Sequence, residues 1–270
     1  MSRIDLSIII VNYNTLNLVV DCVESIKKYS KNFIYEIIIV NNYPEGNDYK
    51  KIKKLYQKND NIKILKSKNF GFGTANNFGT KIAHGEYLFF LNSDTKILDN
   101  SIYKMLNFIH KHDEIGALNP MLRHPDKSIQ KHYFGNFQSL DSVVFRKPKG
   151  ENFEMDKEYF YRQRITGAAM IIKKSKFIDI GGFDQKFFMY FEDEDLCRRL
   201  INVGFNNAVL TTAEIIHLEG KSSRLNKTKK RMYWESQNYY WIKNRGFFIY
   251  FLMRLLRIPY VLWLKILRRA

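Results

Sequence analysis

The sequence predicts an α/β protein with a doubly wound, mostly parallel sheet. Its first quarter alternates short apolar runs rich in β-branched residues with segments whose apolar side chains recur at helical spacing. The apolar runs are residues 6–14, 35–42 and 61–67, and the helical segments are 15–29 and 48–58. Strands buried on both faces of a parallel sheet are continuous apolar runs, and helices between them cover the faces. Ligands of such sheets bind where the strands end in loops.

The same alternation continues in the rest of the chain. A glycine-rich loop that enters a helix (69–85) precedes an apolar strand with an acidic end (86–95), a helix near 100–111 and a less regular region (119–164). Residues 166–184 contain a further buried strand and a turn. Four consecutive acids then open a helix that we expect Gly204 to end.

The composition is that of a globular protein. Of the 270 residues, 45% are hydrophobic and 15% aromatic, which is enough for a substantial core. A chain of this length favours one large domain with an appendage. The two cysteines, Cys22 and Cys197, lie far apart in no metal-ligand spacing, and no apolar signal segment precedes the first strand. We therefore expect two buried structural thiols in a reducing, cytosolic setting.

The segment LNSDT places Asp94 at the end of a buried apolar strand. An unpaired buried charge is costly, so this carboxylate needs a partner. It either binds a cation or caps the helix that follows, and spacing alone leaves both interpretations open. His217 also ends a strand-like run. A lone histidine there is more often structural than a ligand, and it gains functional interest only beside Asp94.

Gly71 and Gly73 lie in the loop ahead of a predicted helix. Glycine allows backbone conformations closed to other residues, and a helix N-terminus offers unpaired N–H groups to phosphate. A tight turn is the alternative interpretation. The loop does not match the dinucleotide-binding fingerprint, and no acidic ribose-binding residue follows at the usual spacing.

Four consecutive acids, Glu192 to Asp195, follow an aromatic run in a chain with a net charge of +17. Carboxylates at a helix N-terminus gain about 0.3–1 kcal/mol each from the helix dipole but repel one another. A solvated first turn accounts for one or two of them, and four beside FFMYF indicate the wall of a pocket. Neighbours diverge by about 100° along a helix, so they cannot share one role. We expect Asp195 to cap the helix or pair with Arg198 or Arg199, and one other acid to face a ligand.

Taken in order, six motifs resemble the inverting family-2 glycosyltransferases of the GT-A fold, especially bacterial rhamnosyltransferase-like enzymes. They are SIIIVNYN, IIIVNN, NFGFGTANNFG, LNSDT, GGFDQKFFMYFEDEDLCRR and HLEGKSS, and the match covers about residues 4–225. The resemblance implies a cytosolic enzyme that moves a sugar from a nucleotide-diphosphate donor with inversion at the anomeric carbon. It fits dTDP-rhamnose or UDP-hexose as the donor, and a saccharide or lipid-linked acceptor in the synthesis of bacterial surface polysaccharide.

The resemblance also implies roles for individual residues. Asp193 would be the general base, Glu192 would shape the donor or acceptor pocket, and Gly167 would contact the acceptor or line the pocket. Asp94, at the position of the family's DxD motif, and His217 would bind Mg²⁺ or Mn²⁺ against the donor diphosphate. The expected donor contacts are Val11, Asn12, Tyr13, Asn41, Asn69, Gly71, Phe72, Asn76, Asn92 and Ser93.

Two positions depart from the family pattern. Asn92 replaces the first acid of the DxD motif. Asn41 stands where the family usually has an aspartate that contacts the pyrimidine base of the donor. An asparagine still accepts the N3–H of the base through its carbonyl oxygen, without the assistance of charge. We therefore expect weaker donor binding with the preference for a pyrimidine retained.

The chain divides into a predicted GT-A domain (1–225) and a basic helical extension (226–270). Residues 221–270 contain thirteen Lys or Arg residues and one acid, Glu235. The stretch FFIYFLMRLLRIPYVLWL is about long enough to cross a bilayer, but two arginines and a proline interrupt it. An amphipathic anchor lying in an anionic membrane surface fits better, and it would place the enzyme at the cytoplasmic face of the cell membrane.

Alternatives stay open for the extension and for the whole protein. The extension would otherwise pack on the core with a solvated basic face. A nucleic-acid partner is not expected, because no RNP-like or zinc-finger pattern accompanies the basic residues. The whole protein would otherwise be a binding protein, with an idle sugar-nucleotide fold tethered to membrane or nucleic acid. The presence of Asp94, Asp193 and His217 together argues against idleness, and nothing in the sequence sets the oligomeric state.

Overall fold

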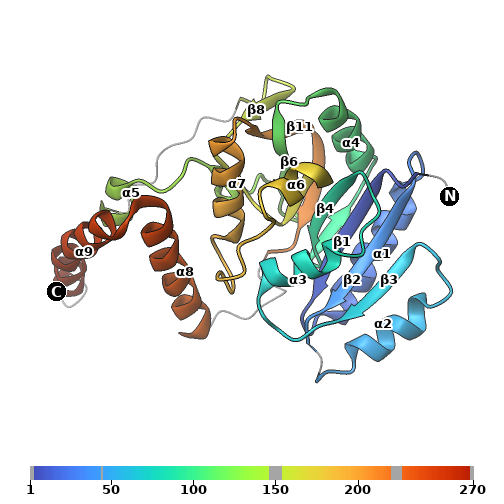
Figure 1. The fold of residues 1–270 in the computed structure, drawn as a ribbon, viewed down its shortest axis with the longest axis horizontal. Helices are drawn as coiled ribbons and strands as arrows, with labels where there is room; N and C mark the ends of the chain where they lie inside the picture. Colours follow the sequence, from blue (N-terminus) through green and yellow to red (C-terminus); the bar gives the residue numbers. More distant parts are fainter. Residues whose placement is uncertain (1–2, 44, 146–153, 220–226, 268–270) are drawn as a thin grey trace.

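The computed structural model describes residues 3–43, 45–145, 154–219 and 227–267 (Figure 1). In this part of the chain a nine-stranded mixed sheet forms the centre. Its strand order is β3-β2-β1-β4-β10-β6-β11-β5, with β8 paired to β11. Helices cover both faces of the sheet, as the sequence predicts. The domain boundary expected between residues 225 and 226 lies outside the described residues.

The first half of the sheet follows the predicted alternation of strands and helices. The strands are β1 (Leu6–Asn12), β2 (Tyr35–Asn41), β3 (Ile62–Lys66) and β4 (Tyr87–Asn92), and the helices are α1 (Leu16–Tyr29), α2 (Asp48–Tyr56) and α3 (Phe72–Thr80). β1 pairs in parallel with β2 and β4, and β2 pairs in parallel with β3. These strands therefore point their carboxyl ends to one edge of the sheet, where ligands are expected.

The second half of the sheet mixes strand directions. Its main elements are β5 (Thr95–Ile97), α4 (Ser101–Lys111), β6 (Ile115–Arg123), β10 (Ala169–Lys173), α6 (Lys174–Asp179), α7 (Glu192–Asn202) and β11 (Asn206–His217). β10 lies antiparallel between β4 and β6, whereas β11 runs parallel to β6. The helix expected after the four acids is α7, and Gly204 follows its end with φ +94°, which favours glycine.

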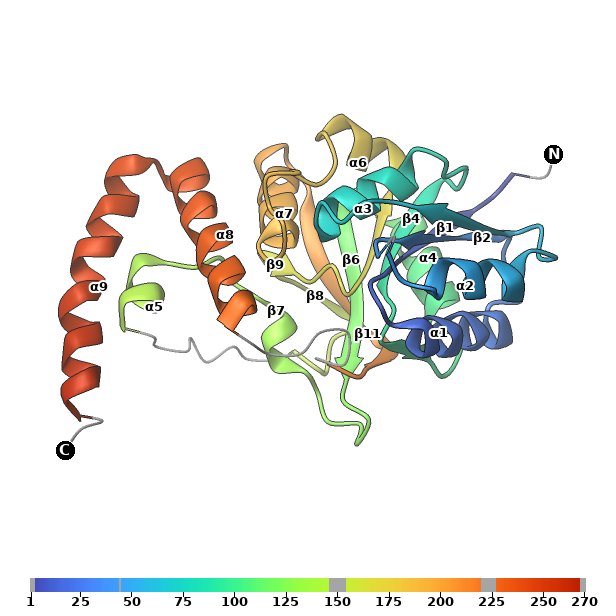
Figure 2. The same ribbon diagram turned by 90° about the horizontal axis from the view of Figure 1, so that it is seen from below.

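The region expected to be less regular contains short elements. They are the 3₁₀ helix η1 (Lys131–Tyr133), β7 (Phe134–Gly135), α5 (Leu140–Phe145), β8 (Tyr159–Tyr161) and β9 (Arg164–Ile165). β7 and β9 pair in a separate antiparallel sheet, and β8 pairs with β11. Figure 2 shows β7, β8 and β9 close to α7, whereas α5 lies apart from α7, beside the helices of residues 227–267.

Two apolar cores lie on opposite faces of the central sheet. Helices α1, α2 and α4 pack on one face, and α3, α6 and α7 pack on the other. Cys22 belongs to the first core and Cys197 to the second, and both are fully buried. Burial raises the pKa of the Cys22 thiol to about 12 and also raises the pKa of Cys197. The prediction of two buried thiols is confirmed.

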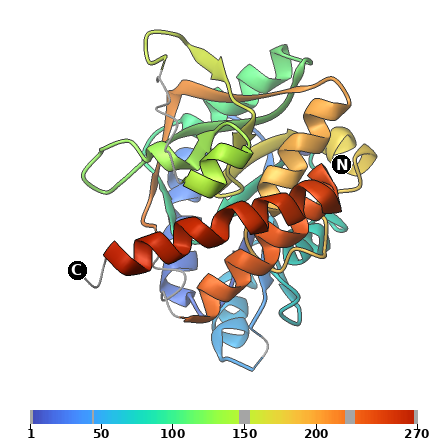
Figure 3. The ribbon, with the colours of Figure 1, turned by 90° about the vertical axis from the view of Figure 1, so that its left-hand side faces the viewer.

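The basic extension forms two helices, α8 (Lys227–Arg245) and α9 (Phe247–Leu267). Gly246 joins them with φ +82°, a left-handed value that suits glycine. Tyr240 and Trp241 of α8 and Met253 of α9 are buried in a third apolar cluster, which also contains residues of α5 and of the segment before α7. Figure 3 shows α9 crossing the outer side of α8. The extension thus packs on the domain through α8, in agreement with the core-packing alternative.

The outer face of α9 is apolar and exposed. Phe247, Phe248, Phe251, Leu255 and Ile258 have relative exposures from 48% to 75%. At about 100° per residue these five side chains fall within one third of the helix circumference. We call them the outer face of α9. Among the helices in the described part of the chain, none combines the length and the apolar character that a bilayer crossing requires.

Candidate active site

The edge formed by the carboxyl ends of the strands collects many of the predicted site residues. β1, β2 and β4 end at Asn12, Asn41 and Asn92. His217, the last residue of β11, reaches the same edge because β11 pairs antiparallel with β5 and sets His217 opposite Thr95. The N–H of the following residue donates to the carbonyl oxygen of Asp94 at 2.8 Å. Backbone pairing therefore brings His217 beside Asp94.

Asp94 and His217 form a buried pair. Nε2 of His217 lies 3.3 Å from Oδ1 of Asp94, and neither side chain is more than 3% exposed. The other ring nitrogen, Nδ1, lies 3.0 Å from Oε1 of Gln130, whose amide nitrogen donates to the carbonyl oxygen of His217 at 2.7 Å. Gln130 therefore makes Nδ1 the donor, and the lone pair of Nε2 in the neutral ring faces a carboxylate oxygen. A proton or a metal cation between these two atoms satisfies both.

This pair of ligands fits a divalent cation. A carboxylate oxygen and an imidazole whose second nitrogen is already hydrogen-bonded are a common combination in metal sites. The side-chain nitrogen of Asn92 lies 3.5 Å from Nε2 of His217, next to the pair. Within the described residues, no group of three or more His, Cys, Asp or Glu side chains is placed to hold a metal ion. Cations of this kind commonly complete their coordination with water and substrate phosphate.

Gln130 and Tyr133 are candidates that the sequence analysis missed. Gln130 is fully buried and orients His217, as described above. The ring of Tyr133 meets the ring of His217 edge to face, with centroids 4.9 Å apart. Burial, and then the carboxylates of Glu219 and Asp94, raises the pKa of Tyr133. Tyr133 therefore stays a neutral hydroxyl beside His217. Neither residue belongs to a recognisable motif.

Asp193 lies in the first turn of α7 and is held by two backbone amides. Its Oδ2 accepts the N–H of Gly167 at 3.0 Å, and its Oδ1 accepts the N–H of Glu194 at 2.8 Å. A Cβ added at Gly167 would lie 3.2 Å from the ring of Phe72 and in ordinary contact with Cβ of Asp193, 3.6 Å away. Asp193 is half-buried, whereas the other three acids of the run are buried. The carboxylate that reaches the surface is thus the one with a fixed orientation.

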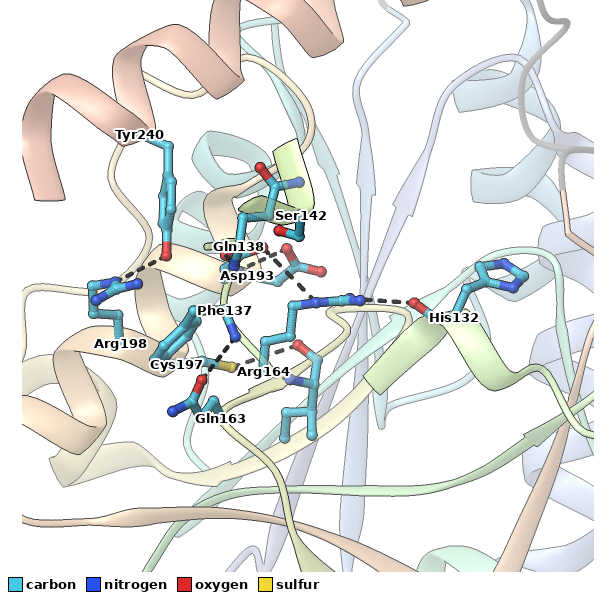
Figure 4. A network of polar contacts seen from close by, with 12 residues as sticks. His132, Phe137, Gln138, Ser142, Gln163, Arg164, Asp193, Cys197, Arg198 and Tyr240 are labelled. Carbon is cyan, nitrogen blue, oxygen red and sulfur yellow. Dashed lines mark hydrogen bonds and ion pairs between the residues drawn. The ribbon is translucent and has the colours of Figure 1, made fainter. Parts of the chain in front are cut away.

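The two neighbours of Asp193 have different environments from it. Burial, followed by the charge of Asp193, raises the pKa of Glu192 to about 8. Glu192 is therefore mostly protonated at pH 7. Burial also raises the pKa of Glu194, whose carboxylate accepts the N–H of Gln138 at 3.3 Å. Figure 4 shows Asp193 together with Gln138 in the polar network around the start of α7. Asp193 is therefore the half-buried acid of this turn, and burial raises the pKa of the acid on each side of it.

The fourth acid, Asp195, forms ion pairs inside the protein. Its carboxylate lies 2.8 Å from Nε of Arg199 and 2.7 Å from Nζ of Lys243 in α8. Of the two arginines expected as partners, Arg199 is the one that pairs with Asp195. Arg198 instead donates from Nε to the hydroxyl of Tyr240 at 2.9 Å, as Figure 4 shows. The four acids thus have different environments, and their separate roles stay a prediction.

The glycine-rich loop packs tightly on the segment that precedes α7. Gly71 has φ +103°, and a Cβ at this position would lie 2.3 Å from the carbonyl oxygen of Phe188. The same oxygen accepts the N–H of Phe72 at 3.0 Å. Oδ1 of Asn69 accepts the N–H of Gly71 at 3.2 Å. Only glycine fits at position 71, and the first amide of α3 is bonded to the protein rather than available to a phosphate.

The predicted base-binding side of the site has a buried amide, an exposed tyrosine ring and a half-buried one. Asn41 is fully buried, its Oδ1 accepts Nδ2 of Asn12 at 2.7 Å, and its Nδ2 donates to the carbonyl oxygen of Tyr43 at 2.9 Å. A nucleobase bonded to Asn41 would therefore use the second lone pair of Oδ1. Tyr13 is 47% exposed, and its ring meets that of Tyr43 edge to face. The tyrosine pair offers an aromatic surface at this end of β1 and β2.

Three other predicted donor contacts bond within the protein. Val11 packs against the apolar core on the α3 side of the sheet. Oγ of Ser93 lies 3.1 Å from Oγ1 of Thr15. Asn76 is 1% exposed and donates from Nδ2 to the carbonyl oxygen of Phe72 at 3.1 Å. Donor contacts by these residues stay predictions.

Comparison with known families identifies the family of the chain. Residues 7–181, from β1 to the end of α6, match the model of "Glycosyl transferase family 2". The chain belongs to glycosyl transferase family 2. Residues 150–231 of this family 2 protein also match the model "N-terminal domain of galactosyltransferase", a stretch that includes Asp193 and His217. The family resemblance drawn from the motifs is confirmed.

Characterised relatives of the family 2 protein occur in bacteria. It is 27% identical over 195 residues to the O-antigen biosynthesis protein RfbC of Myxococcus xanthus, a match that covers 68% of this chain and 15% of that protein. It is 25% identical over 200 residues to the N-acetylglucosaminyl-diphospho-decaprenol L-rhamnosyltransferase of Mycobacterium tuberculosis, and the match covers 62% of each. The family 2 protein thus spans less than two thirds of the length of both relatives.

Solved structures match the fold of the family 2 protein. The crystal structure of GalNAc-T7 with UDP, GalNAc and Mn²⁺ superposes with a TM-score of 0.65 at 16% identity, over 81% of this chain and 45% of that chain. At this level of identity the likeness shows the fold alone. The predicted GT-A fold, a large sheet with helices on both faces and C-terminal helices added, is confirmed.

Proposed function

We propose that the protein transfers a sugar from a nucleotide-diphosphate donor to a hydroxyl group of a glycan or lipid-linked acceptor, with inversion at the anomeric carbon. The observation that carries the proposal is the placement of Asp193. Both of its oxygens accept backbone N–H groups, and its acidic neighbours are buried. One charged, oriented carboxylate therefore lies at the ligand-binding edge of a fold that belongs to a glycosyltransferase family.

The proposed reaction is a single displacement. Asp193 takes the proton of the acceptor hydroxyl while the acceptor oxygen forms a bond to the anomeric carbon of the donor sugar. The bond between that carbon and the diphosphate breaks, and the nucleoside diphosphate leaves with the bonding electrons. Attack from the face opposite the leaving group inverts the configuration. The N–H groups of Gly167 and Glu194 fix the plane of the carboxylate and so aim its remaining lone pairs.

Asp94 and His217 would hold a divalent cation, Mg²⁺ or Mn²⁺, at the diphosphate. Such a cation neutralises the charge that develops on the leaving diphosphate. The support is the convergence of Oδ1 of Asp94 and Nε2 of His217 and the Mn²⁺ in the structure of GalNAc-T7. Gln130 keeps the imidazole in the tautomer that a ligand needs. The ring of Tyr133 packs edge to face against the imidazole of His217 and supports its position.

The relatives support particular substrates. The name of the mycobacterial relative specifies rhamnose transfer to a sugar carried on a lipid diphosphate, and that of the Myxococcus relative specifies O-antigen biosynthesis. We therefore propose dTDP-rhamnose or UDP-hexose as the donor and a lipid-linked saccharide as the acceptor, in bacterial surface polysaccharide synthesis. The base would lie at Asn41 and the tyrosine pair.

An assay of the purified protein tests this function. Incubation with Mn²⁺, a lipid-diphosphate N-acetylglucosamine acceptor and each of dTDP-rhamnose, UDP-glucose and UDP-N-acetylglucosamine should give acceptor-dependent release of nucleoside diphosphate with one donor. Nuclear magnetic resonance of the product should show the anomeric configuration opposite to that of the donor. EDTA should stop the reaction, and added Mn²⁺ should restore it. Binding of a donor without transfer to any lipid-linked or free saccharide would instead favour the idle binding protein.

A lipid-linked acceptor suggests that the outer face of α9 contacts the membrane. We place this face on the anionic surface of the cytoplasmic leaflet of the cell membrane, so that the enzyme is peripheral to the membrane. Its five apolar side chains would be buried among the lipids, and Arg254 borders them on an exposed position. Each Lys or Arg near an anionic leaflet contributes about 1 kcal/mol, and residues 221–270 supply thirteen. Apolar insertion and positive charge therefore both favour binding to an anionic membrane.

Liposome co-sedimentation checks the membrane role. The protein should pellet with vesicles that contain phosphatidylglycerol and much less with phosphatidylcholine alone. Replacing Phe248 and Phe251 with serine should weaken binding at least about tenfold, because two large aromatic side chains no longer insert. The matched control replaces Leu55 and Ile178, which are 56% and 55% exposed on α2 and α6, with serine. High salt should release only part of the wild-type protein.

Two outcomes would contradict the membrane role. One is wild-type protein that stays in the supernatant with anionic vesicles. The other is a wild-type dimer that the serine variant of α9 converts to a monomer, which would make the outer face of α9 an interface between two copies of the chain.

A further inference from the structure

The backbone immediately before the acidic run is strained. Tyr190 and Phe191, the two residues before Glu192, have φ values of +71° and +68°. The left-handed region is unfavourable for a residue other than glycine, and two successive residues with large aromatic side chains are uncommon there. Neighbouring contacts must hold such a turn in place. We call residues 189–191 the aromatic turn.

Helix α8 supplies contacts to every residue of the aromatic turn. Oγ of Ser236 donates to the carbonyl oxygen of Met189 at 2.7 Å. The ring of Tyr233 lies edge to face with Tyr190, with centroids 5.7 Å apart, and its centroid is 5.3 Å from that of Phe191. Such ring pairs stabilise a structure beyond the area that they bury. Together these contacts oppose the relaxation of the two left-handed residues.

Further contacts of α8 hold the helix to α7 on either side of the turn. The ring centroid of Tyr240 lies 5.2 Å from that of Phe191. Nζ of Lys243 lies 2.7 Å from carboxylate oxygens of both Asp184 and Asp195, which precede and follow the aromatic turn. Lys243 thus bridges the chain before the turn and the first turn of α7.

The glycine-rich loop contacts the same segment from another side. The carbonyl oxygen of Phe188 accepts the N–H of Phe72, and Gly71 allows the close approach. The segment that leads to Asp193 is therefore fixed both by the glycine-rich loop and by α8. Figure 1 shows α8 and α3 on either side of the loop that enters α7.

We infer that α8 belongs to the catalytic unit, with Tyr233, Ser236 and Lys243 as positioning residues that hold the aromatic turn and so orient Asp193. The inference rests on the proposed role of Asp193 as the base. Without these contacts the turn relaxes toward an unstrained conformation, and the carboxylate loses its alignment with the N–H of Gly167. A misplacement of about 1 Å in a reacting group costs roughly 100-fold in rate.

Paired substitutions at Tyr233 test the inference. Tyr233→Ala removes both ring contacts and should lower kcat at least about tenfold, which corresponds to about 1.4 kcal/mol. The KM for the donor should stay within about twofold, because α8 acts on the base. Tyr233→Phe keeps the rings and should retain kcat within about threefold. Glu235→Ala, on the exposed side of α8, serves as the control for changes of this helix.

A suppressor and a second, milder variant complete the test. Asparagine tolerates the left-handed region better than tyrosine, so Tyr190→Asn should restore part of the kcat lost in Tyr233→Ala. Ser236→Ala removes one hydrogen bond and should lower kcat about threefold to tenfold with the fold intact. Hydrogen exchange should speed up in residues 189–196 of Tyr233→Ala and not in β1 or β2.

The outcomes separate this inference from the proposed function. A wild-type protein without any transfer activity contradicts the proposed function, and the exchange measurement then decides the role of α8 alone. Wild-type kcat in both Tyr233→Ala and Ser236→Ala overturns the inference and leaves the function standing. Unchanged exchange in residues 189–196 of Tyr233→Ala also overturns it.

Discussion

Replacing Asp193 with asparagine should abolish sugar transfer and leave donor binding nearly unchanged. Asparagine keeps the size of the side chain but lacks the basic oxygen that takes the proton of the acceptor. General-base catalysis contributes about 100- to 10,000-fold, so kcat should fall at least about 100-fold. The donor is expected to bind at the strand ends and the Asp94–His217 pair, which the substitution does not alter. Turnover of labelled acceptor and calorimetric titration with the donor measure the two effects.

The matched control for this substitution is Asp60→Asn. Asp60 is an exposed acid in the turn between α2 and β3, so its loss should change neither transfer nor donor binding. A variant at position 193 that keeps more than roughly a hundredth of wild-type turnover would show that another group is the base. Glu192 would then be the first candidate, because it is the adjacent acid and has a pKa of about 8.

Replacing Asp94 with asparagine should remove high-affinity binding of Mn²⁺. The amide keeps a carbonyl oxygen but loses the negative charge that faces Nε2 of His217. We expect the affinity for Mn²⁺ in the presence of the nucleoside diphosphate to fall at least about 100-fold, more than substitutions beyond the direct ligands cause. Calorimetric titration of Mn²⁺ into protein with UDP or dTDP measures this loss without any need for turnover.

Gln130→Leu should cause a smaller loss in the same titration with Mn²⁺. The substitution leaves both expected ligands in place but removes the acceptor at Nδ1 of His217, so the ring is free to change tautomer. The affinity for Mn²⁺ should fall about 10- to 100-fold. Unchanged affinity in Asp94→Asn would place the metal elsewhere. A loss in Asp94→Asn with none in Gln130→Leu would show that the orientation of His217 does not limit binding.

The first half of the fold follows from local sequence, and much of the second half does not. β1, β2 and β4 are apolar runs that end in asparagine, and their parallel pairing agrees with the helices between them. β10 is an equally apolar run, but nothing local specifies that it enters the sheet antiparallel between β4 and β6. Pairing of strands that lie far apart in the chain depends on tertiary packing, which no short window contains.

The candidate site also contains some residues that the sequence indicated and others that it did not. The motifs indicated Asp94, Asp193 and His217, and the structure brings Asp94 and His217 together. Gln130 was missed because its partner lies 87 residues away and a single glutamine has no pattern. The amphipathic pattern of the extension also does not predict which of its aromatic residues are buried, because the two helices differ in this respect. Tyr240 is buried against the domain, whereas Phe248 of α9 is 75% exposed.

The two cysteines of the native protein should be unreactive toward electrophiles because both thiols are buried. Cys22 and Cys197 have no access to solvent, and their raised pKa values leave almost no thiolate at neutral pH. A maleimide or a disulfide reagent therefore reacts with either cysteine only after the layer that covers it has opened. Because the two sulfurs lie in separate cores, one on α1 and the other on α7, their alkylation rates report the local opening of the two faces of the sheet independently.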